Sequence, residues 1–459
     1  MESQTTIEPG EKVAVVGFGR SGQSVVKYLA TCGAEIMVSD TRHYHELESN
    51  EKQGLIDCSA EYEGGVHTDD FLIKASRVVI SPGVALEHPA LMSVKEQGIP
   101  VIGELTLAAD QFPAPVIAIT GTNGKTTVTE LIGELLTAAG YKPFIGGNIG
   151  TPIADYLMNP APFDIVVLEL SSFQLEISDF FVPNVAVLLN ISPDHLDRHG
   201  TLERYAAAKM NIFTGGGAID LAIMNGDDRL CKDYEHLSNR SSYRYFGLKP
   251  EYEASISEAG VCISDATKRD CYDLGGSRLE TLSGRQNCAA ALLAIQPFKV
   301  SENVVKEILH SYQPGAHRLQ VITEQDGVTY INDSKATNTG AVGLALEQLG
   351  GRVLLIAGGK DKGEDYRLLR QAVARNVKEL ILIGEAAPRL KQALGDLGPV
   401  EIARSLDSAV SYAASIAVPG DFVLLSPACA SFDMFKDYLD RGNCFINAVN
   451  RLDLSSSRG

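Results

Sequence analysis

The stretch 116-VIAITGTNGKTTVTE-130 decides the fold of this chain, because an apolar run leads through a glycine-containing turn into a helix-forming segment. That order predicts a strand, a phosphate-binding loop and a helix. Gly121 permits a sharp turn out of the strand, and Gly124 lets backbone amides approach phosphate oxygens. A standard loop also has glycine at position 119, where this chain has Ile119. The pattern therefore predicts a shortened form of the loop.

The residues that follow the turn favour a bound nucleotide. Lys125 can neutralise the β- and γ-phosphates, and the hydroxyl of Thr126 can ligate Mg²⁺. The helix that begins there points its N-terminal amides at the anion. The alternative is a glycine turn that carries an exposed lysine. The strand before the turn and the helix after it argue against that alternative.

Length and composition limit the possible functions. With 459 residues, 45% of them hydrophobic and 21% charged, the chain resembles a globular enzyme of two or three domains. A net charge of −18 argues against nucleic acid as the main partner, because phosphate neutralisation needs a basic surface. The polar N-terminus and the lack of an apolar run near 20 residues predict no signal peptide and no membrane span, hence a cytoplasmic protein.

The eight cysteines are scattered along the chain, and none forms a C-x-x-C pair. Such spacing is typical of reduced thiols in an intracellular enzyme. We therefore expect reduced cysteines, and neither disulfides nor a zinc site. The positions are Cys32, Cys58, Cys231, Cys262, Cys271, Cys288, Cys429 and Cys444.

Short runs rich in valine, isoleucine and leucine alternate with amphipathic helical stretches along almost the whole chain. Continuous apolar runs are typical of strands that are buried on both faces of a parallel sheet. The sequence therefore predicts doubly wound α/β domains, with an antiparallel flank in residues 240–283. Proline-containing breaks near 103–115 and 311–316 predict three domains: 1–103, 104–314 and 315–459.

A second glycine motif, 13-VAVVGFGRSGQS-24, lies in the first predicted domain. Gly17, Gly19 and Gly22 form a G-x-G-x-x-G pattern between a strand and a helix, and Asp40 ends the next strand. This pattern predicts a Rossmann-like domain that binds a diphosphate at a helix N-terminus. A nicotinamide-dependent dehydrogenase is one alternative, but it would leave the loop at 120–127 unexplained.

Polar residues follow two further strands of the middle domain. Glu169 ends the strand in 164-DIVVLELSSFQLE-176, where it can complete the coordination of Mg²⁺, although a solvated loop acid is common there. His195 follows another strand in 190-NISPDHLDRHG-200. Lys209 lies in the helical stretch 203-ERYAAAKMNIF-213. Such a lysine usually snorkels to solvent, and the alternative is a lysine that carries added CO₂ and ligates a metal.

Three polar segments of the last domain follow strands as well: 332-NDSKATN-338, 358-GGKDKGED-365 and 425-LSPACASFDMFKDY-438. Carboxyl ends of parallel strands gather on one rim of a sheet. Lysines and hydroxyls on that rim are suited to a small carboxylated substrate, although polar loops at a domain edge are the plain alternative.

Taken together, these segments resemble the Mur ligase family, whose members form amide bonds with ATP during peptidoglycan precursor synthesis. TGTNGKTT is similar to that family's phosphate loop. The resemblance covers nearly the whole chain and includes GNIG at 147–150, ELSSFQ at 169–174, DHLDRH at 194–199, AAAK at 206–209 and GAHR at 315–318. NDSKATN and SPACASFD are similar to the members that add D-glutamate to UDP-N-acetylmuramoyl-L-alanine. Siblings that add other amino acids typically have a D-Y-A-H-type sequence where NDSKATN stands.

The resemblance implies that the first domain holds the UDP part of the substrate and the middle domain holds ATP. The implied UDP-substrate residues are Gly17, Gly19, Ser21, Gly22, Asp40, Thr41, Arg42, Ser81, Gly83, Asn148 and His195. The implied ATP residues are Gly121, Thr122, Asn123, Gly124, Lys125, Thr126, Thr127, Asn287, Arg318 and Asp333. We expect a monomer that acts on these small molecules through an acyl phosphate.

It also implies a catalytic set of Lys125, Glu169, His195 and Lys209. Two Mg²⁺ ions are expected, one at Thr126 and Glu169 and the other at His195 and a carbamylated Lys209. The implied D-glutamate residues are Thr337, Lys362, Ser431 and Tyr438.

The chain departs from the family pattern at two places. The family's H-N-x-x-N is replaced by Gln286-Asn287-Cys288-Ala289-Ala290, which changes part of the expected adenine contact. Tyr438 stands where phenylalanine is common. Two further alternatives are a folylpolyglutamate-synthase-like ligase, which lacks a domain like residues 1–103, and a nucleotide-binding regulator without catalysis.

Overall fold

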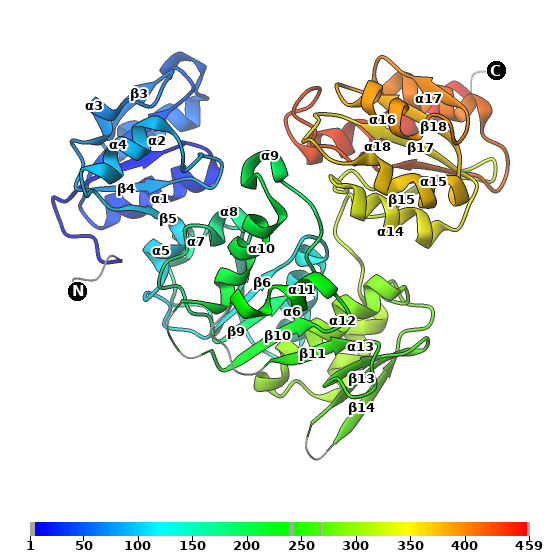
Figure 1. The fold of residues 1–459 in the computed structure, drawn as a ribbon, viewed down its shortest axis with the longest axis horizontal. Coiled ribbons are helices and arrows are strands. Elements are labelled where there is room, and N and C mark those ends of the chain that lie inside the picture. The colour runs from blue at the N-terminus through cyan, green and yellow to red at the C-terminus, as the bar shows by residue number, and fades with distance from the viewer. Residues whose placement is uncertain (1–4, 216, 218, 238–242, 266–267, 457–459) are drawn as a thin grey trace. The chain divides into compact units, whose positions relative to one another are not determined.

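The structure is a computed structural model, and it describes residues 5–215, 217, 219–237, 243–265 and 268–456. The chain divides into two compact units. The first unit joins Met1–Ile191 with Glu203–Tyr312, and the second joins Ser192–Leu202 with Gln313–Gly459. Three sheets follow one another along the chain, each accompanied by helices (Figure 1).

The first sheet contains five parallel strands in the order β3-β2-β1-β4-β5. Alternate residues of β1 pack into two different cores, since Val13 and Val15 belong to one cluster and Ala14 and Val16 to another. The apolar run of β1 is therefore buried on both faces. The strands are β1 (Lys12–Val16), β2 (Glu35–Asp40), β3 (Glu61–Gly64), β4 (Arg77–Ile80) and β5 (Val101–Gly103). The helices are α1 (Arg20–Thr31), η1 (Tyr44–Glu46), α2 (Ser49–Asp57), α3 (Asp69–Leu72), α4 (Pro89–Glu96) and α5 (Glu104–Ala108).

The second sheet has nine strands in the order β14-β13-β12-β11-β10-β9-β6-β8-β7. From β7 to β12 in this order, each pair of adjacent strands is parallel, and β13 is antiparallel to both β12 and β14. The antiparallel flank predicted for 240–283 is thus shorter than expected, because β11 and β12 extend the parallel sheet. Residues 240–242 and 266–267 of that segment lie outside the described residues. The strands are β6 (Val116–Thr120), β7 (Pro143–Gly147), β8 (Ile165–Glu169), β9 (Val185–Leu188), β10 (Leu221–Asn225), β11 (Arg244–Gly247), β12 (Ala254–Ile256), β13 (Gly260–Ser264) and β14 (Arg269–Asp273).

Helices of the second sheet's region fill its core. The fully buried strand β6 contributes Ile117 and Ile119 to a cluster that also contains Val128 and Leu131 of α6 and Ala290 of α12. The helices are α6 (Lys125–Ala138), α7 (Ile153–Met158), α8 (Ser172–Leu175), α10 (Leu202–Met210), η2 (Asn211–Phe213), α11 (Arg229–Asp233), η3 (Glu235–Leu237), α12 (Leu282–Ala294), η4 (Gln296–Phe298) and α13 (Glu302–Ser311).

The third sheet lies in the second unit and has the order β15-β16-β20-β17-β18-β19, with β15 antiparallel and the other pairs parallel. Strand β17 is buried on both faces, since Leu355 and Leu354 belong to different clusters. The strands are β15 (Gln320–Gln325), β16 (Val328–Asn332), β17 (Val353–Gly358), β18 (Val377–Ile383), β19 (Val400–Ile402) and β20 (Phe422–Leu425). The helices are α9 (Leu196–His199), α14 (Thr339–Leu349), η5 (Tyr366–Leu369), α15 (Arg370–Asn376), α16 (Ala387–Leu394), α17 (Leu406–Ile416) and α18 (Tyr438–Ser456).

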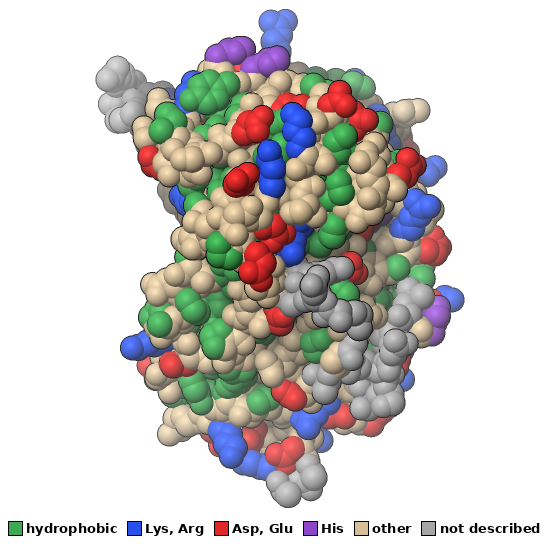
Figure 2. Space-filling model, turned by 90° about the vertical axis from the view of Figure 1, so that its left-hand side faces the viewer, with side chains coloured by type: hydrophobic (Ala, Val, Ile, Leu, Met, Phe, Trp, Pro, Cys, Tyr) green, Lys and Arg blue, Asp and Glu red, His purple; other side chains and the backbone are tan. Residues whose placement is uncertain are grey.

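These three mostly parallel sheets confirm the predicted fold class, whereas the domain boundaries after residues 103 and 314 stay predictions. No helix in the described part of the chain is long and apolar enough to cross a membrane. On the face drawn in Figure 2, the described acidic and basic side chains are interspersed, and no continuous basic area is visible among them.

The expectation that all cysteines are reduced is wrong for one pair, since Cys262 and Cys271 form a disulfide. Cys262 of β13 stands directly opposite Cys271 of β14 in the antiparallel register, and their Cα atoms are 4.0 Å apart. The C-x-x-C criterion missed this pair because strand register, which the spacing of nine residues does not reveal, brings the two thiols together. Six cysteines are free.

We expect thiol titration of the denatured, unreduced protein to detect six thiols, because six of the eight cysteines are free. Reduction before denaturation should expose the remaining pair. The variant C262S leaves Cys271 without its partner and should titrate one thiol more than the unreduced wild type. Eight thiols in the unreduced wild type would contradict the pairing.

Candidate active site

The turn between β6 and α6 has the shape that a phosphate loop requires. Gly121 has φ +154° and Gly124 has φ +85°, and Gly124 is the N-cap of α6. A Cβ atom on Gly121 would lie 2.9 Å from the Cβ of Leu189, and one on Gly124 would lie 2.3 Å from Oδ1 of Asn287. The strand, loop and helix therefore follow as predicted, and both glycines are required by backbone conformation and by space.

Lys125 is folded back over this loop. Its Nζ donates hydrogen bonds to the backbone oxygens of Gly121 and Thr122, both at 2.8 Å. The ammonium group thus lies beside the loop at the N-terminus of α6, where the backbone amides also favour an anion. This arrangement is suited to binding phosphate groups.

Glu169 is the centre of a buried polar group next to the loop. Strand β8 pairs with β6 so that Glu169 stands opposite Ile119, and the side chain of Glu169 is 1% exposed. Thr126 Oγ1 donates to Glu169 Oε2 at 2.6 Å, and Asn148 Nδ2 donates to Glu169 Oε1 at 2.7 Å. The β6–β8 pairing therefore places the predicted carboxylate, hydroxyl and amide together.

The donor set beside the loop fits Mg²⁺, which prefers oxygen ligands and usually shares them with substrate phosphates. Thr126 supplies a hydroxyl oxygen and Glu169 a carboxylate, both buried. Among the described residues, no group of three or more histidine, cysteine, aspartate or glutamate side chains could hold a metal by itself. A Mg²⁺ ion held here by Thr126 and Glu169 would take its other ligands from water and substrate phosphates.

Lys209 of α10 points into the same loop. Its side chain is 1% exposed, its Nζ donates to Gly121 O at 2.8 Å, and it lies 4.6 Å from the ring centre of Tyr205. Lys209 therefore does not reach solvent, which removes the plain alternative of a snorkelling lysine, while the carbamate stays a prediction. Tyr205 also contacts the loop, through a hydrogen bond of 3.1 Å between its hydroxyl and that of Thr122.

Asn287 reaches the loop from α12, as its approach to Gly124 shows. Of the two residues that depart from the family pattern, Ala290 is buried in the core beneath α6. Cys288 and Ala289 are buried as well. Asn287 is thus the residue of this segment that lies against the phosphate loop.

The glycine loop of the first sheet is closely packed at two of its three glycines. A Cβ on Gly22 would lie 2.0 Å from Gly17 O, and one on Gly17 would lie 3.0 Å from the Cβ of Ser81. Ser81 Oγ also donates to Gly17 O at 2.8 Å. Gly19 and Gly83, by contrast, have open space beside them, which leaves room for a ligand at the loop.

Asp40 and Arg42 lie next to that loop. Asp40 Oδ2 accepts from the backbone N–H of Phe18 at 2.5 Å, and Oδ1 accepts from Arg42 Nε at 3.1 Å. Burial alone would raise the pKa of Asp40, but these hydrogen bonds outweigh burial and lower the pKa below its usual value. Arg42 is also paired with Glu51 at 3.0 Å, and Thr41 is exposed. Ser21, in contrast, donates its hydroxyl to Glu104.

In the second unit, His195 lies in a segment that packs against the third sheet's loops. His195 has φ +54° and precedes α9, and its neighbour Asp194 accepts from Lys362 Nζ at 2.8 Å and from Asn338 Nδ2 at 3.1 Å. Burial would lower the pKa of Lys362, but Asp194 and Glu364 outweigh burial and raise it. Burial raises the pKa of Glu364 to about 7.

Asp333 follows β16 and is buried. Its carboxylate accepts from Ser426 Oγ at 2.8 Å and from the backbone N–H of Leu319 at 3.2 Å. Burial raises the pKa of Asp333 to about 7, against the effect of those hydrogen bonds. Because Leu319 directly follows Arg318, this hydrogen bond keeps Asp333 close to Arg318.

Three of the four predicted D-glutamate residues lie on loops of the same sheet, and the fourth begins a helix. Ser431 is 2% exposed and follows β20, and Tyr438 begins α18 with Lys335 Nζ 5.0 Å from its ring centre. Thr337 donates its backbone N–H to Lys335 O at 3.0 Å. Lys362 lies in the loop after β17. These residues gather at the carboxyl end of the strands, as the rim argument predicts.

Comparison with known proteins now identifies the family. Three family descriptions match consecutive parts of the chain: a Mur ligase MurD-like N-terminal domain (11–103), a Mur ligase middle domain (119–295) and a Mur ligase glutamate ligase domain (317–429). A relative from Desulfotalea psychrophila is 46% identical over 96% of each chain, and one from Geotalea uraniireducens is 39% identical over 98% of this chain and 99% of its own. Both relatives are named UDP-N-acetylmuramoylalanine–D-glutamate ligase. The chain belongs to the Mur ligase family.

Solved structures agree with the fold of a Mur ligase. A pseudomurein peptide ligase type C from Methanothermus fervidus superposes with a TM-score of 0.61 at 18% identity, over 96% of this chain and all of its own. A UDP-N-acetylmuramate–alanine ligase from Thermotoga maritima gives 0.59 at 18% identity, over 97% of this chain and 99% of its own. Membership of the family confirms the predicted ATP-dependent ligase that forms amide bonds. Which residues of this Mur ligase act on which ligand stays a prediction.

Several residues that complete these polar groups were not singled out from the sequence. Asp194 and Glu364 pair with Lys362, and Asn338 donates to Asp194. Tyr205 contacts both Thr122 and Lys209. Asp194 and Glu364 stand within the motifs DHLDRH and GGKDKGED, so their place in a motif was the available signal. No comparable signal marked Glu104, which lies outside every quoted motif.

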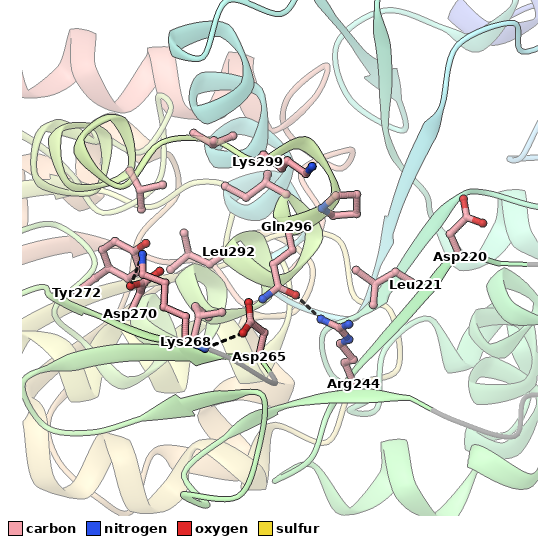
Figure 3. Close-up of a pocket in the computed structure, with 15 residues that line it drawn as sticks. Asp220, Leu221, Arg244, Asp265, Lys268, Asp270, Tyr272, Leu292, Gln296 and Lys299 are labelled. Carbon is pink, nitrogen blue, oxygen red and sulfur yellow. Dashed lines mark hydrogen bonds and ion pairs between the residues drawn. The ribbon is translucent and has the colours of Figure 1, made fainter.

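A cavity of about 500 Å³ lies elsewhere in the first unit (Figure 3). Its lining includes Leu221 at the start of β10 and Arg244 at the start of β11, so it opens at the end of the parallel strands opposite to the phosphate loop. Lys268 Nζ pairs with Asp270 at 2.7 Å, and Arg244 donates to Gln296. The cavity is therefore separate from the residues that surround the phosphate loop.

We expect G124A to weaken ATP binding by about tenfold or more, because the new methyl group adds left-handed strain and displaces Asn287 from the loop. Isothermal titration calorimetry with ATP and Mg²⁺ measures this effect, and circular dichroism checks the fold.

The matched control is G140A, since Gly140 also has a positive φ of +92° but has no atom within 4 Å of the added Cβ. This control should lose about 1 kcal/mol of stability and keep its ATP affinity. Equal loss of ATP affinity in both variants would contradict the proposed role of the loop geometry.

Proposed function

We propose that this chain joins D-glutamate to UDP-N-acetylmuramoyl-L-alanine, with ADP and phosphate as the other products. The observation that carries the proposal is the match to relatives named for that reaction, at 46% and 39% identity over nearly the full length of both chains. The glutamate ligase domain match over 317–429 supports the choice of amino acid. It covers Thr337 and Lys362, two of the residues that we propose for D-glutamate.

The chemistry requires activation, because a carboxylate does not condense with an amine in water. The alanyl carboxylate attacks the γ-phosphorus of ATP, and the bond to the β-phosphate oxygen breaks to release ADP. The amine of D-glutamate then attacks the acyl phosphate carbon, loses a proton, and phosphate leaves. The first step brings an anion to a polyanion, so positive groups at the γ-phosphate lower the barrier.

Lys125 and the N-terminal amides of α6 are the groups that we assign to that task. The hydrogen bonds of 2.8 Å from Lys125 Nζ to the loop carbonyls keep the ammonium group beside these amides, which supports the assignment. Thr126 and Glu169 would hold Mg²⁺, which when bound supplies charge neutralisation between the phosphates. Asn148 keeps the carboxylate of Glu169 oriented by its hydrogen bond of 2.7 Å.

Lys209 and His195 are proposed for a second Mg²⁺. A bare ammonium at Lys209 would repel a metal, whereas a carbamate would bind one. The neutral amine adds to CO₂ with loss of one proton, and the product carries one negative charge. The hydrogen bond of 2.8 Å from Lys209 Nζ to Gly121 O, at the start of the phosphate loop, supports this proposal.

The remaining assignments follow the two glycine loops and the third sheet. Gly17–Gly22, Asp40, Arg42 and Ser81 would hold the UDP part, and the loops that carry Lys362, Ser431 and Tyr438 would hold D-glutamate. Because ATP, UDP-linked sugars and amino acids are small cytoplasmic metabolites, we propose an enzyme of the cytoplasm. That it acts as a monomer is a separate part of the proposal.

The function is tested by phosphate release with ATP, Mg²⁺, UDP-N-acetylmuramoyl-L-alanine and D-glutamate, leaving out each component in turn. We expect steady release only in the complete mixture, since both acceptor and amine are needed for turnover. K125A should reduce this release by about a thousandfold, because the phosphates lose a positioned charge. Release that is equally fast without D-glutamate or without the UDP substrate would disprove the proposal.

The carbamate is tested with K209A, which we expect to be nearly inactive because the metal loses its anionic ligand. Added short-chain carboxylic acids such as acetate should restore part of the activity by occupying the space of the missing side chain. K391A, a change at an exposed lysine on α16, controls for general effects of the acid. Full activity of K209A without acid would remove the carbamate from the mechanism.

A further inference from the structure

Glu104 is a buried carboxylate that the proposed mechanism does not use. It is the first residue of α5, directly after the last strand of the first sheet, and it is 3% exposed. A buried carboxylate is costly unless it is hydrogen-bonded, so its partners define its role. Its two oxygens have different partners, and these come from different parts of the first unit.

One oxygen of Glu104 holds the glycine loop of the first sheet. The hydroxyl of Ser21, in the middle of Gly17–Gly22, donates to Glu104 Oε2 at 2.6 Å. The Ser21 hydroxyl is therefore already engaged. The part of Ser21 that remains for a diphosphate is its backbone N–H in the first turn of α1, as is usual for a glycine loop of this type.

The other oxygen holds the start of α7. The backbone N–H of Ala154 donates to Glu104 Oε1 at 2.8 Å. The N-cap of α7 is Pro152, which provides no side-chain hydrogen bond to the helix. Glu104 thus supplies the cap that α7 lacks in its own sequence.

Helix α7 follows the turn that carries Asn148, and that turn is linked to the phosphate loop through Glu169. Its residue Ala154 is buried in the core of the first sheet, although α7 follows β7 of the second sheet. The turn between β7 and α7 carries Asn148, whose backbone N–H donates to Glu169 O at 2.8 Å and whose side chain donates to Glu169 Oε1. Glu169 in turn accepts from Thr126 of the phosphate loop.

We propose that Glu104 is a positioning residue that fixes the UDP-binding glycine loop relative to the Asn148 turn beside the ATP loop. This inference rests on the proposed function. A single carboxylate bonds to the glycine loop and to the start of α7, the helix that follows the Asn148 turn. The distal UDP group and the reacting end of the same substrate are thereby held in one register. Such register matters because small displacements of a bound substrate reduce the rate strongly.

The role requires hydrogen bonds and no charge. Burial raises the pKa of Glu104, against the effect of the bonds from Ser21 and Ala154. A glutamine can keep both bonds, because its oxygen accepts from Ala154 N–H and its amide nitrogen donates to Ser21 Oγ. Leucine has a similar size and can make neither bond.

The experiment compares kcat and KM for the UDP substrate in the wild type, E104Q and E104L. We expect E104L to raise KM by about tenfold and to lower kcat, because two buried polar partners lose their bonds. E104Q should stay within about threefold of the wild type in both constants. An unchanged KM in a folded E104L, or an E104Q that is as impaired as E104L, would overturn the proposal.

The matched control is S24A, which removes the bond of 2.5 Å between Ser24 of α1 and Asp155 of α7. It loosens the same two helices without touching Glu104 or the glycine loop. Its KM should stay within about twofold of the wild type, and a KM rise equal to that of E104L would mean general loosening and contradict the proposal.

If E104L does not fold, S21A cuts only the glycine-loop side of the contact. It should raise KM for the UDP substrate and leave kcat unchanged, and an unchanged KM would contradict the proposal.

Failure of the proposed function gives a different result, since the wild type itself would then not turn over the complete mixture. In that case calorimetric titration of UDP into wild type, E104Q and E104L still tests whether Glu104 holds the glycine loop.

Discussion

The left-handed backbone at Gly124 is the constraint on which the site depends. It turns the chain from β6 into α6, so that Lys125, Thr126 and the first amides of the helix emerge at the carboxyl end of the strand. Strand β8 then supplies Glu169 through its register with β6. A slip of one residue in that register would turn Glu169 to the other face of the sheet and separate it from Thr126. Lys209 and Asn287 meet at the same short loop.

The net charge of −18 shows how local the binding of polyanionic ligands must be. The cations beside the phosphate loop are Lys125 and Lys209, and both bond to its carbonyl oxygens. Arg42 beside the other glycine loop is paired with two carboxylates. The attraction for a polyanionic ligand thus has to come from a few cations and oriented backbone amides, because the chain has no broad basic field. Such short-range attraction depends on the packing that holds each group in place.

The parts of the fold and the site that could be predicted are those formed by residues close together in the sequence. The strand, loop and helix around 116–130 and the fingerprint at Gly17–Gly22 are local patterns, and polar residues at strand ends follow from the geometry of parallel sheets. Contacts between distant segments could not be predicted in this way: Ser21 and Glu104 are 83 positions apart, and Lys362 and Asp194 are 168 apart. The Cys262–Cys271 pair is close in sequence but depends on strand register, and the burial of Lys209 depends on how α10 packs.

The packing of α7 also relates the fold to the order of the two proposed reaction steps. Ala154 of α7 is buried in the core of the first sheet, and the two glycine loops, which we propose for UDP and for ATP, belong to one compact unit. The residues proposed for D-glutamate belong to the other unit. The first proposed step needs only the UDP substrate and ATP, whose reacting atoms must be held in one fixed geometry. The amino acid is needed only in the second proposed step, and the residues proposed to bind it lie outside the unit that contains the two glycine loops.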